Sequence, residues 1–136
     1  MSWSEEARTE LIDRAIAIRD RAYAPYSKYH VGAALLAASG EIYEGINVEN
    51  AAYPSSMCAE RTAVFQAVTA GERKFTAIAV ASSNGGSPCG ACRQVLSEFG
   101  VDLLVIVVDD TGKVLIESKL SELLPESFGP SDLNTG

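Results

Sequence analysis

Cysteine, histidine and positive charge are scarce in this chain of 136 residues, and these shortages exclude several classes of protein. Three cysteines are an odd number and too few for the disulfide framework of a small secreted domain. Eleven basic against eighteen acidic residues give a net charge of −7, which repels the phosphates of nucleic acids. No apolar run approaches the roughly 20 residues of a membrane helix, and the polar start "MSWSEEARTE" lacks the apolar core of a signal peptide. We therefore expect a cytoplasmic protein with no nucleic-acid or membrane partner and with a small, neutral substrate.

Hydrophobic residues, by contrast, make up 47% of the chain. That content and this length predict a single domain over residues 1–136 that is long enough to bury a core. Apolar side chains at helical spacing predict a first helix over residues 4–24. Ser2 and Glu5 are expected to form its capping box, and Pro25 to mark its end.

The rest of the chain alternates between strand and helix patterns. The stretch "YHVGAALLAASGEIYEGINVEN" predicts two strands joined by a turn at Gly40, and a second helix follows over residues 57–70, closed by Gly71. After the buried strand "FTAIAVAS", a third helix is predicted between Pro88 and Gly100. Two further strands, "VDLLVIVVDD" and "KVLIES", and a short helix, "LSELL", complete the pattern.

Strands that alternate with helices after an initial hairpin predict the α/β class, as a three-layer α/β/α sandwich. Right-handed crossovers place parallel strands side by side, so the sheet should be mixed, with about five strands. Ligands of such sheets bind where strands end and helices begin, which directs attention to the starts of the second and third helices.

All three cysteines lie at these helix starts: Cys58 in the first turn of the second helix, and Cys89 and Cys92 in that of the third. The positive end of a helix dipole lowers the pKa of a thiol and favours the thiolate, which is the form that binds metals. Thiolates select zinc among the common divalent metals, although copper(I) and iron–sulfur clusters are compatible with the same ligands. The pattern predicts a metal site, with zinc as the expected ion.

Two other interpretations of the cysteines stay open. A C-x-x-C pair is typical of a thioredoxin-like dithiol, and a structural zinc site would take a fourth protein ligand, for which the chain offers one histidine, His30. If His30 is an ordinary surface residue, the fourth position is left to water, as in a catalytic zinc site. "CAE" at one helix start and "PCGAC" at the other agree with the signature of zinc deaminases, in which a third cysteine can replace histidine and the glutamate is not a ligand.

Glu60 and Arg61 lie two and three residues after Cys58. Glu60 lies about 200° around the helix from Cys58, which disfavours it as a second ligand but suits a proton shuttle. Otherwise it is an acidic residue that satisfies the helix dipole. Arg61 is expected either to donate hydrogen bonds to the cysteine sulfurs, offsetting the −1 charge of three thiolates around Zn²⁺, or to form a surface ion pair.

With these residues identified, the chain resembles the small, homotetrameric type of cytidine deaminase almost from end to end. The blocks that carry the resemblance occur in the order of that family: "APYSKYHVGAAL", "GINVENAAYP", "CAERTA", "SPCGACRQ" and "ELLPESFGP". The resemblance implies hydrolytic deamination of cytidine and deoxycytidine to uridine and deoxyuridine with release of ammonia, in pyrimidine salvage. It also implies one zinc ion per subunit and a free nucleoside as substrate.

The resemblance also implies a role for each matching residue. Cys58, Cys89 and Cys92 fall on the zinc ligands, and Glu60 falls on the general acid and base. The positions that match substrate contacts are Tyr29, Asn47, Glu49, Ala51, Tyr53, Ala59 and Phe128. Asn47 and Glu49 match the ribose-binding pair, and positions two apart in an extended strand do project to the same side. Ala51, Tyr53 and Phe128 match positions that reach the active site of a neighbouring subunit.

Two departures from the family affect the base and sugar preference rather than the catalytic groups. Tyr29 stands where the family usually has a phenylalanine packed against the pyrimidine, and its added hydroxyl needs a partner. "PSSM" before Cys58 replaces a commonly more apolar loop. The rival functions are deamination of a related aminopyrimidine such as blasticidin S, editing of a polynucleotide, which the acidic charge disfavours, and a non-enzymatic structural zinc or redox role.

Overall fold

Five strands form one sheet in the order β2-β1-β3-β4-β5. The computed structural model describes residues 3–85, 90–100 and 102–123. The strands are β1 (Gly32–Ala37), β2 (Ile42–Ile46), β3 (Phe75–Ala81), β4 (Leu104–Val108) and β5 (Val114–Lys119). β3 and β4 are parallel, while the other neighbouring pairs are antiparallel. The predicted mixed sheet, with the initial hairpin turning at Gly40 in the left-handed region (φ 96°), is confirmed.

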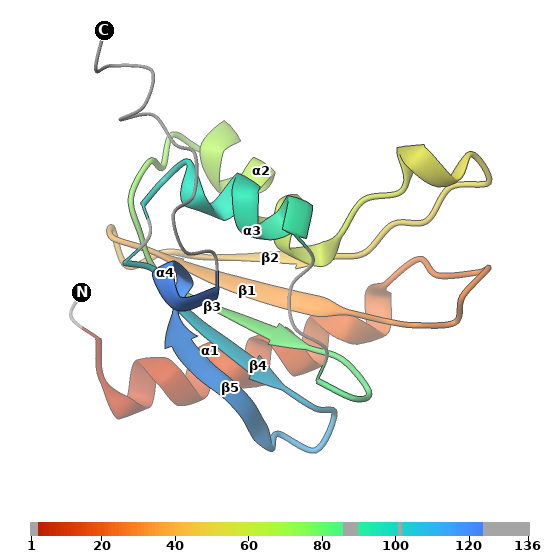
Figure 1. Cartoon of the computed structure of the whole chain (residues 1–136). Helices are drawn as coiled ribbons and strands as arrows, with labels where there is room; N and C mark the ends of the chain where they lie inside the picture. The colour runs from red at the N-terminus through yellow and green to blue at the C-terminus, as the bar shows by residue number, and fades with distance from the viewer. Residues whose placement is uncertain (1–2, 86–89, 101, 124–136) are drawn as a thin grey trace, which may run out of the picture.

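Helices cover both faces of this sheet (Figure 1). They are α1 (Glu5–Ile18), α2 (Ala59–Thr69), α3 (Gly90–Ser97) and the short α4 (Leu120–Leu123). α1 packs on one face, where its Leu11 and Ala15 join alternate residues of the central strands. α2 and α3 pack on the opposite face with the intervening residues of the same strands. Because successive strand residues point to opposite faces, one sheet supplies both cores, and the three-layer sandwich is confirmed.

The first helix is shorter than predicted and begins with a different cap. Ser4, in extended conformation, accepts a hydrogen bond from the backbone N–H of Ala7 at 3.1 Å, so the expected capping role of Ser2 is wrong. α1 ends at Ile18, and a 3₁₀ turn, η1 (Arg19–Arg21), takes up part of the residues predicted to continue the helix. None of the helices in the described ranges combines the length and apolar character needed to cross a membrane.

The second helix lies unusually close to the hairpin, at Gly45 on β2. A Cβ atom at Gly45 would lie 2.4 Å from the carbonyl oxygen of Ala59 and 2.4 Å from the backbone nitrogen of Ala63. Small residues on both sides therefore permit the contact between α2 and β2. Gly71, at φ 101°, follows the end of α2 as predicted.

The functional residues gather at one end of the sheet. Gly32 at the start of β1 pairs with both Ile46 at the end of β2 and Ala81 at the end of β3. The same edge therefore receives the segment before β1, the segment after β2, and the carboxyl end of β3. This is the edge at which ligands of α/β sheets bind.

Candidate active site

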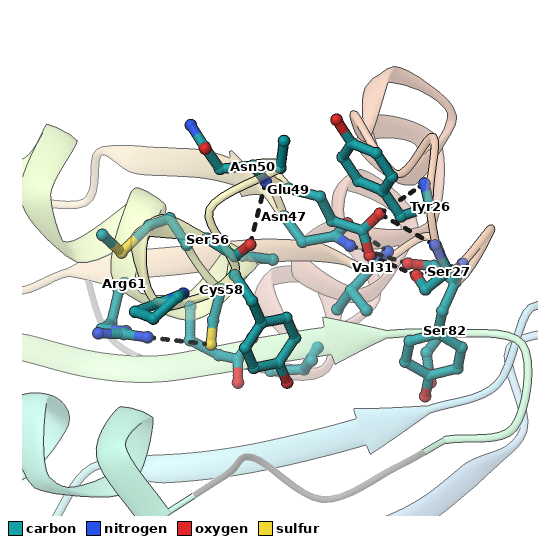
Figure 2. Close-up of a pocket in the computed structure, with 18 residues that line it drawn as sticks. Tyr26, Ser27, Val31, Asn47, Glu49, Asn50, Ser56, Cys58, Arg61 and Ser82 are labelled. Carbon is teal, nitrogen blue, oxygen red and sulfur yellow. Dashed lines mark hydrogen bonds between the residues drawn. The ribbon is translucent and has the colours of Figure 1, made fainter.

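A cavity of about 800 Å³ opens at this end of the sheet. Nine of the residues predicted to form the site line it: Tyr29, Asn47, Glu49, Ala51, Tyr53, Cys58, Ala59, Glu60 and Arg61. In Figure 2, Cys58 and Arg61 lie on one side of the view, and Glu49, Ser27 and Tyr26 lie on the other. The sulfur of Cys58 thus lies at one end of the cavity and the carboxylate of Glu49 at the other. The cavity volume is in the range that holds a small organic ligand.

The chain enters α2 through a short extended pairing. Val48 and Met57 exchange backbone hydrogen bonds of 2.9 and 2.8 Å, which holds residues 49–56 as a loop and leads Met57 directly to the helix. Cys58 keeps extended angles, φ −80° and ψ 154°, and is therefore the N-cap of α2 rather than a residue of its first turn as predicted. Its side chain still lies at the positive end of the helix dipole.

Glu60 is buried, with 5% of its surface exposed, in the first turn of α2. Burial is the largest cause that raises the pKa of its carboxyl group, and proximity to Cys58 raises it further. Hydrogen bonds from its own backbone N–H and from Cys92, together with the charge of Arg61, lower the same pKa, but the net direction is upward. A carboxyl group in this environment holds a proton more readily than one in water, as a proton shuttle must.

Arg61 reaches the cysteine sulfurs. Its Nη2 donates a hydrogen bond to Cys58 Sγ over 3.5 Å (Figure 2), and this contact is the largest cause that raises the pKa of the guanidinium. The proximity of Cys92 raises the pKa of the same guanidinium further. Within the described ranges Arg61 takes part in no ion pair with a carboxylate. The geometry is that of a cation directed at thiolates.

The donor set fits a thiophilic metal ion. Cys58 and the fully buried Cys92 come from the starts of different helices, yet one guanidinium and one carboxyl group interact with both of them. Two sulfurs that share such neighbours are the chemistry that zinc prefers. Cys89 lies outside the described residues, and the remainder contains no cluster of three histidine, cysteine or acidic side chains placed to bind a metal. His30 is not among the lining residues of the cavity.

Asn47 and Glu49 organise the opposite end of the cavity. Asn47 Oδ1 accepts a hydrogen bond from Val31 N at 2.9 Å, and Asn47 Nδ2 donates to the Tyr29 carbonyl at 2.8 Å. The Glu49 carboxylate accepts hydrogen bonds from the backbone N–H groups of Tyr26 and Ser27 and from the Ser27 hydroxyl (Figure 2). The Ser27 hydroxyl is the main cause that lowers the pKa of Glu49, so this carboxylate stays ionised.

The remaining predicted residues occupy different environments. Tyr29 has 36% of its surface exposed, and Tyr53, on the 3₁₀ turn η2 (Tyr53–Ser55), has 85% exposed. Ala59 is fully buried at the start of α2. Cys92 does not line the cavity, but it interacts with Glu60 and Arg61, which do. Phe128, like Cys89, lies outside the described residues.

Several polar residues in or next to the cavity were not predicted from the sequence, among them Ser27, Ser82 and Asn84. Ser27 bridges Glu49 and the backbone N–H of Tyr29, and Ser82 and Asn84 follow the end of β3. Ser27 carries a local signal, because a serine whose hydroxyl accepts from the backbone N–H two residues later is typical of a turn. Ser82 and Asn84 carry none beyond their position after a buried strand.

Two cysteines at helix starts, one of them fully buried, a buried carboxyl group that interacts with both, and a cavity at the edge of a mixed sheet define a metal-dependent α/β enzyme. The sequence model of the cytidine and deoxycytidylate deaminase zinc-binding region matches residues 5–108. The chain is 46% identical over 127 residues to the cytidine deaminase of Sporosarcina psychrophila, covering 92% of this chain and 93% of that protein. It is 45% identical over 130 residues to that of Halalkalibacterium halodurans, covering 93% and 98%.

Solved structures agree. The crystal structure of cytidine deaminase from Burkholderia pseudomallei superposes with a TM-score of 0.84 at 46% identity, over 93% of this chain and 100% of that one. The chain therefore belongs to the cytidine and deoxycytidylate deaminase family.

Proposed function

We propose that the protein catalyses the zinc-dependent hydrolytic deamination of cytidine and deoxycytidine, giving uridine or deoxyuridine and ammonia. The observation that carries the proposal is the position of Glu60, a buried carboxyl group that interacts with both Cys58 and Cys92 and faces the cavity. Membership of the deaminase family supports the same reaction.

Cys58, Cys89 and Cys92 would hold one zinc ion per subunit. When bound, zinc supplies the Lewis acidity that activates water at neutral pH. Three thiolates leave this site with a formal charge of −1. Arg61, which donates to the sulfur of Cys58, and the positive ends of α2 and α3 offset that charge.

Glu60 moves the protons of the reaction. It takes a proton from the water whose oxygen attacks C4 of the pyrimidine, and it delivers that proton to N3. The second proton of the water passes through Glu60 to the amino group, the bond between C4 and nitrogen breaks, and ammonia leaves. The carboxyl group is ionised at the start and at the end of the cycle, and its upward-shifted pKa matches the step in which it holds a proton.

The sugar binds at the other end of the cavity, near Asn47 and Glu49. An amide has two N–H donors and a carboxylate accepts about four hydrogen bonds. The contacts found in the described part of the chain use one donor of Asn47 and three acceptor directions of Glu49, so both side chains retain capacity for a sugar hydroxyl. Tyr29, Ala51, Tyr53, Ala59 and Phe128 complete the binding of the nucleoside.

The proposal includes the setting of the reaction: the protein is a cytoplasmic homotetramer that acts in pyrimidine salvage on free nucleosides. The net charge of −7 supports a neutral substrate over a nucleic acid. Tyr53, exposed over 85% of its surface yet lining the cavity, supports an assembly in which a neighbouring subunit covers this ring.

Glu60→Gln tests the reaction. The substitution keeps the size of the side chain but removes its proton transfer, so deamination should fall at least about 100-fold while the zinc content stays that of the parent. The parent and the variant are compared for loss of cytidine, deoxycytidine and blasticidin S absorbance, with zinc measured on the same samples. Near-parental activity in Glu60→Gln refutes the role of Glu60. A parent that consumes only blasticidin S refutes the nucleoside substrate, and a zinc-loaded parent that consumes none of the three supports a structural role.

A further inference from the structure

Tyr29 is one of the residues that line the cavity, and its hydroxyl has a specific partner. Tyr29 Oη donates to Asn84 Oδ1 over 2.6 Å, across 55 residues of sequence. The backbone of Tyr29 is fixed on both sides: its N–H donates to Ser27 Oγ at 3.0 Å, and its carbonyl accepts from Asn47 Nδ2 at 2.8 Å. A neighbouring serine and two distant segments therefore hold one residue.

The backbone before Tyr29 requires this support. Lys28 has φ 62°, in the left-handed region that non-glycine residues rarely adopt. Such a conformation persists where the surrounding contacts determine it. The two backbone contacts of Tyr29 set where the ring begins, but they leave rotation about its side-chain bonds open. The hydroxyl contact is the one that fixes the far end of the ring.

Asn84 is placed to make this contact by a turn at the end of β3. The buried Ser82 hydroxyl accepts a hydrogen bond from Gly85 N at 2.9 Å and lies 3.4 Å from Asn84 Oδ1. Gly85 has φ 67°, and a Cβ atom there would lie 2.0 Å from Leu115 Cδ1, so the turn is packed against β5. The amide of Asn84 thus stands on a defined piece of backbone although its own side chain is exposed.

We propose that Asn84 is a positioning residue for nucleoside binding: by accepting a hydrogen bond from the Tyr29 hydroxyl, it holds the tyrosine ring in the orientation that the bound base meets. The inference rests on the proposed function. It assigns a role to a residue that does not line the cavity, and it accounts for the hydroxyl at position 29. Asn84 acts on substrate binding and not on the protons of the reaction, which belong to Glu60.

Asn84→Ala removes the acceptor and should raise the KM for cytidine about two- to tenfold, the range expected for loss of one hydrogen bond. The kcat should stay within about twofold of the parent, because the contact is not made to the reacting atoms. Binding of uridine to the zinc-loaded enzyme, measured by calorimetry, should weaken by the same factor as KM. Tyr29→Phe removes the other half of the bond and should have the same effects.

Two further variants separate positioning from general damage. Asn84→Asp keeps an oxygen acceptor and should have the parental KM when residue 29 is tyrosine. Combined with Tyr29→Phe, the same substitution should leave KM as high as in Tyr29→Phe alone. The double variant Tyr29→Phe with Asn84→Ala should match either single variant, since both delete the same interaction. Ser83→Ala, on the neighbouring exposed residue, is the matched control and should leave KM, kcat and zinc content unchanged.

The outcomes separate the two proposals. Parental KM and uridine affinity in Asn84→Ala, or an equal effect of Asn84→Ala with tyrosine and with phenylalanine at position 29, would overturn the role of Asn84. Loss of zinc, or a fall in kcat at unchanged KM, would overturn it as well, because Asn84 would then support the metal end. A parent that leaves cytidine unchanged refutes the proposed function instead.

Discussion

Arg61 interacts with both cysteines that the structure describes, Cys58 and Cys92. Its positive charge affects how the two sulfurs can bind a metal ion. Arg61 donates to Cys58 over 3.5 Å and interacts with Cys92. Its Nε is buried without a hydrogen-bond partner in the described residues, so the guanidinium is held by its contact with sulfur and not by a network of carboxylates. A cation in that position withdraws electron density from thiolates, which a metal needs if it is to act as a Lewis acid.

Replacing Arg61 with glutamine should therefore impair the chemistry. We expect deamination or zinc affinity to fall about 10- to 100-fold, because loss of a hydrogen-bond partner of a metal ligand usually has an effect of this size. Both are checked by steady-state kinetics and by zinc retention against a chelator. Arg21→Gln, which removes the same charge at an exposed position of η1, is the control and should change neither. Full activity and full zinc retention in Arg61→Gln would show that the contact with Cys58 is dispensable.

Individual residue types at this site could be predicted from the sequence, whereas several of their partners could not. Cys58, Glu60 and Arg61 lie within four consecutive positions of the chain, so a local pattern contains them. The bond between Tyr29 and Asn84 joins residues 55 positions apart and depends on where β3 ends relative to β1. The contacts of Asn47 with Tyr29 and Val31 depend on the same packing. Long-range contacts of this kind leave no periodic signal in the sequence.

At the scale of elements, the position of α2 depends on the lack of a side chain at Gly45. A Cβ atom there would enter the backbone of α2 at 2.4 Å from Ala59 O and from Ala63 N. Backbone atoms cannot move aside as a flexible side chain does, so the whole start of α2 would have to shift. Cys58 and Glu60 lie at that start, and the packing of a helix on a hairpin thereby sets the geometry of the site.

Gly45→Ala should destabilise the fold by about 1–3 kcal/mol, as overpacking of a dense core does. It should also lower zinc affinity, because the start of α2 is displaced. Urea unfolding and chelator competition measure the two effects. Gly71→Ala is the control: it meets no atom within 4 Å and costs only the left-handed backbone, about 1 kcal/mol, without loss of zinc affinity. Equal zinc affinity in the parent and Gly45→Ala would show that α2 tolerates the displacement.

The order and type of the elements followed from the sequence, but some of their ends did not. Continuous apolar runs in the central strands, which are buried on both faces, and helical spacing in α1 and α2 are patterns that burial enforces over many residues. The ends depend on single contacts, such as the Ser4 cap and the pairing of Val48 with Met57, which keeps Cys58 outside the helix. A one-residue shift at such an end matters, because Cys58 is the residue expected to bind metal.

At the scale of the whole molecule, the described chain leaves one wall of the cavity open to solvent. Tyr53 lines the cavity from η2 with 85% of its surface exposed, and Tyr26 lines it with 62% exposed. Aromatic rings that stay in water forgo the free energy of burial, and such rings concentrate at subunit interfaces. An assembly in which Tyr53 enters the neighbouring site would bury this ring and close that wall.

Mixing two inactive variants tests whether the active sites are shared. A Glu60→Gln subunit retains Tyr53, and a Tyr53→Ala subunit retains Glu60. If Tyr53 serves the neighbouring subunit, reassembly of a mixture places an intact Glu60 beside an intact Tyr53 in some sites, and activity should rise above that of either variant alone. If each ring serves its own subunit, no site in the mixture is complete and activity stays at the level of the separate variants. Light scattering on the parent gives the accompanying check, with an expected mass of about four times the 14.4 kDa of one chain.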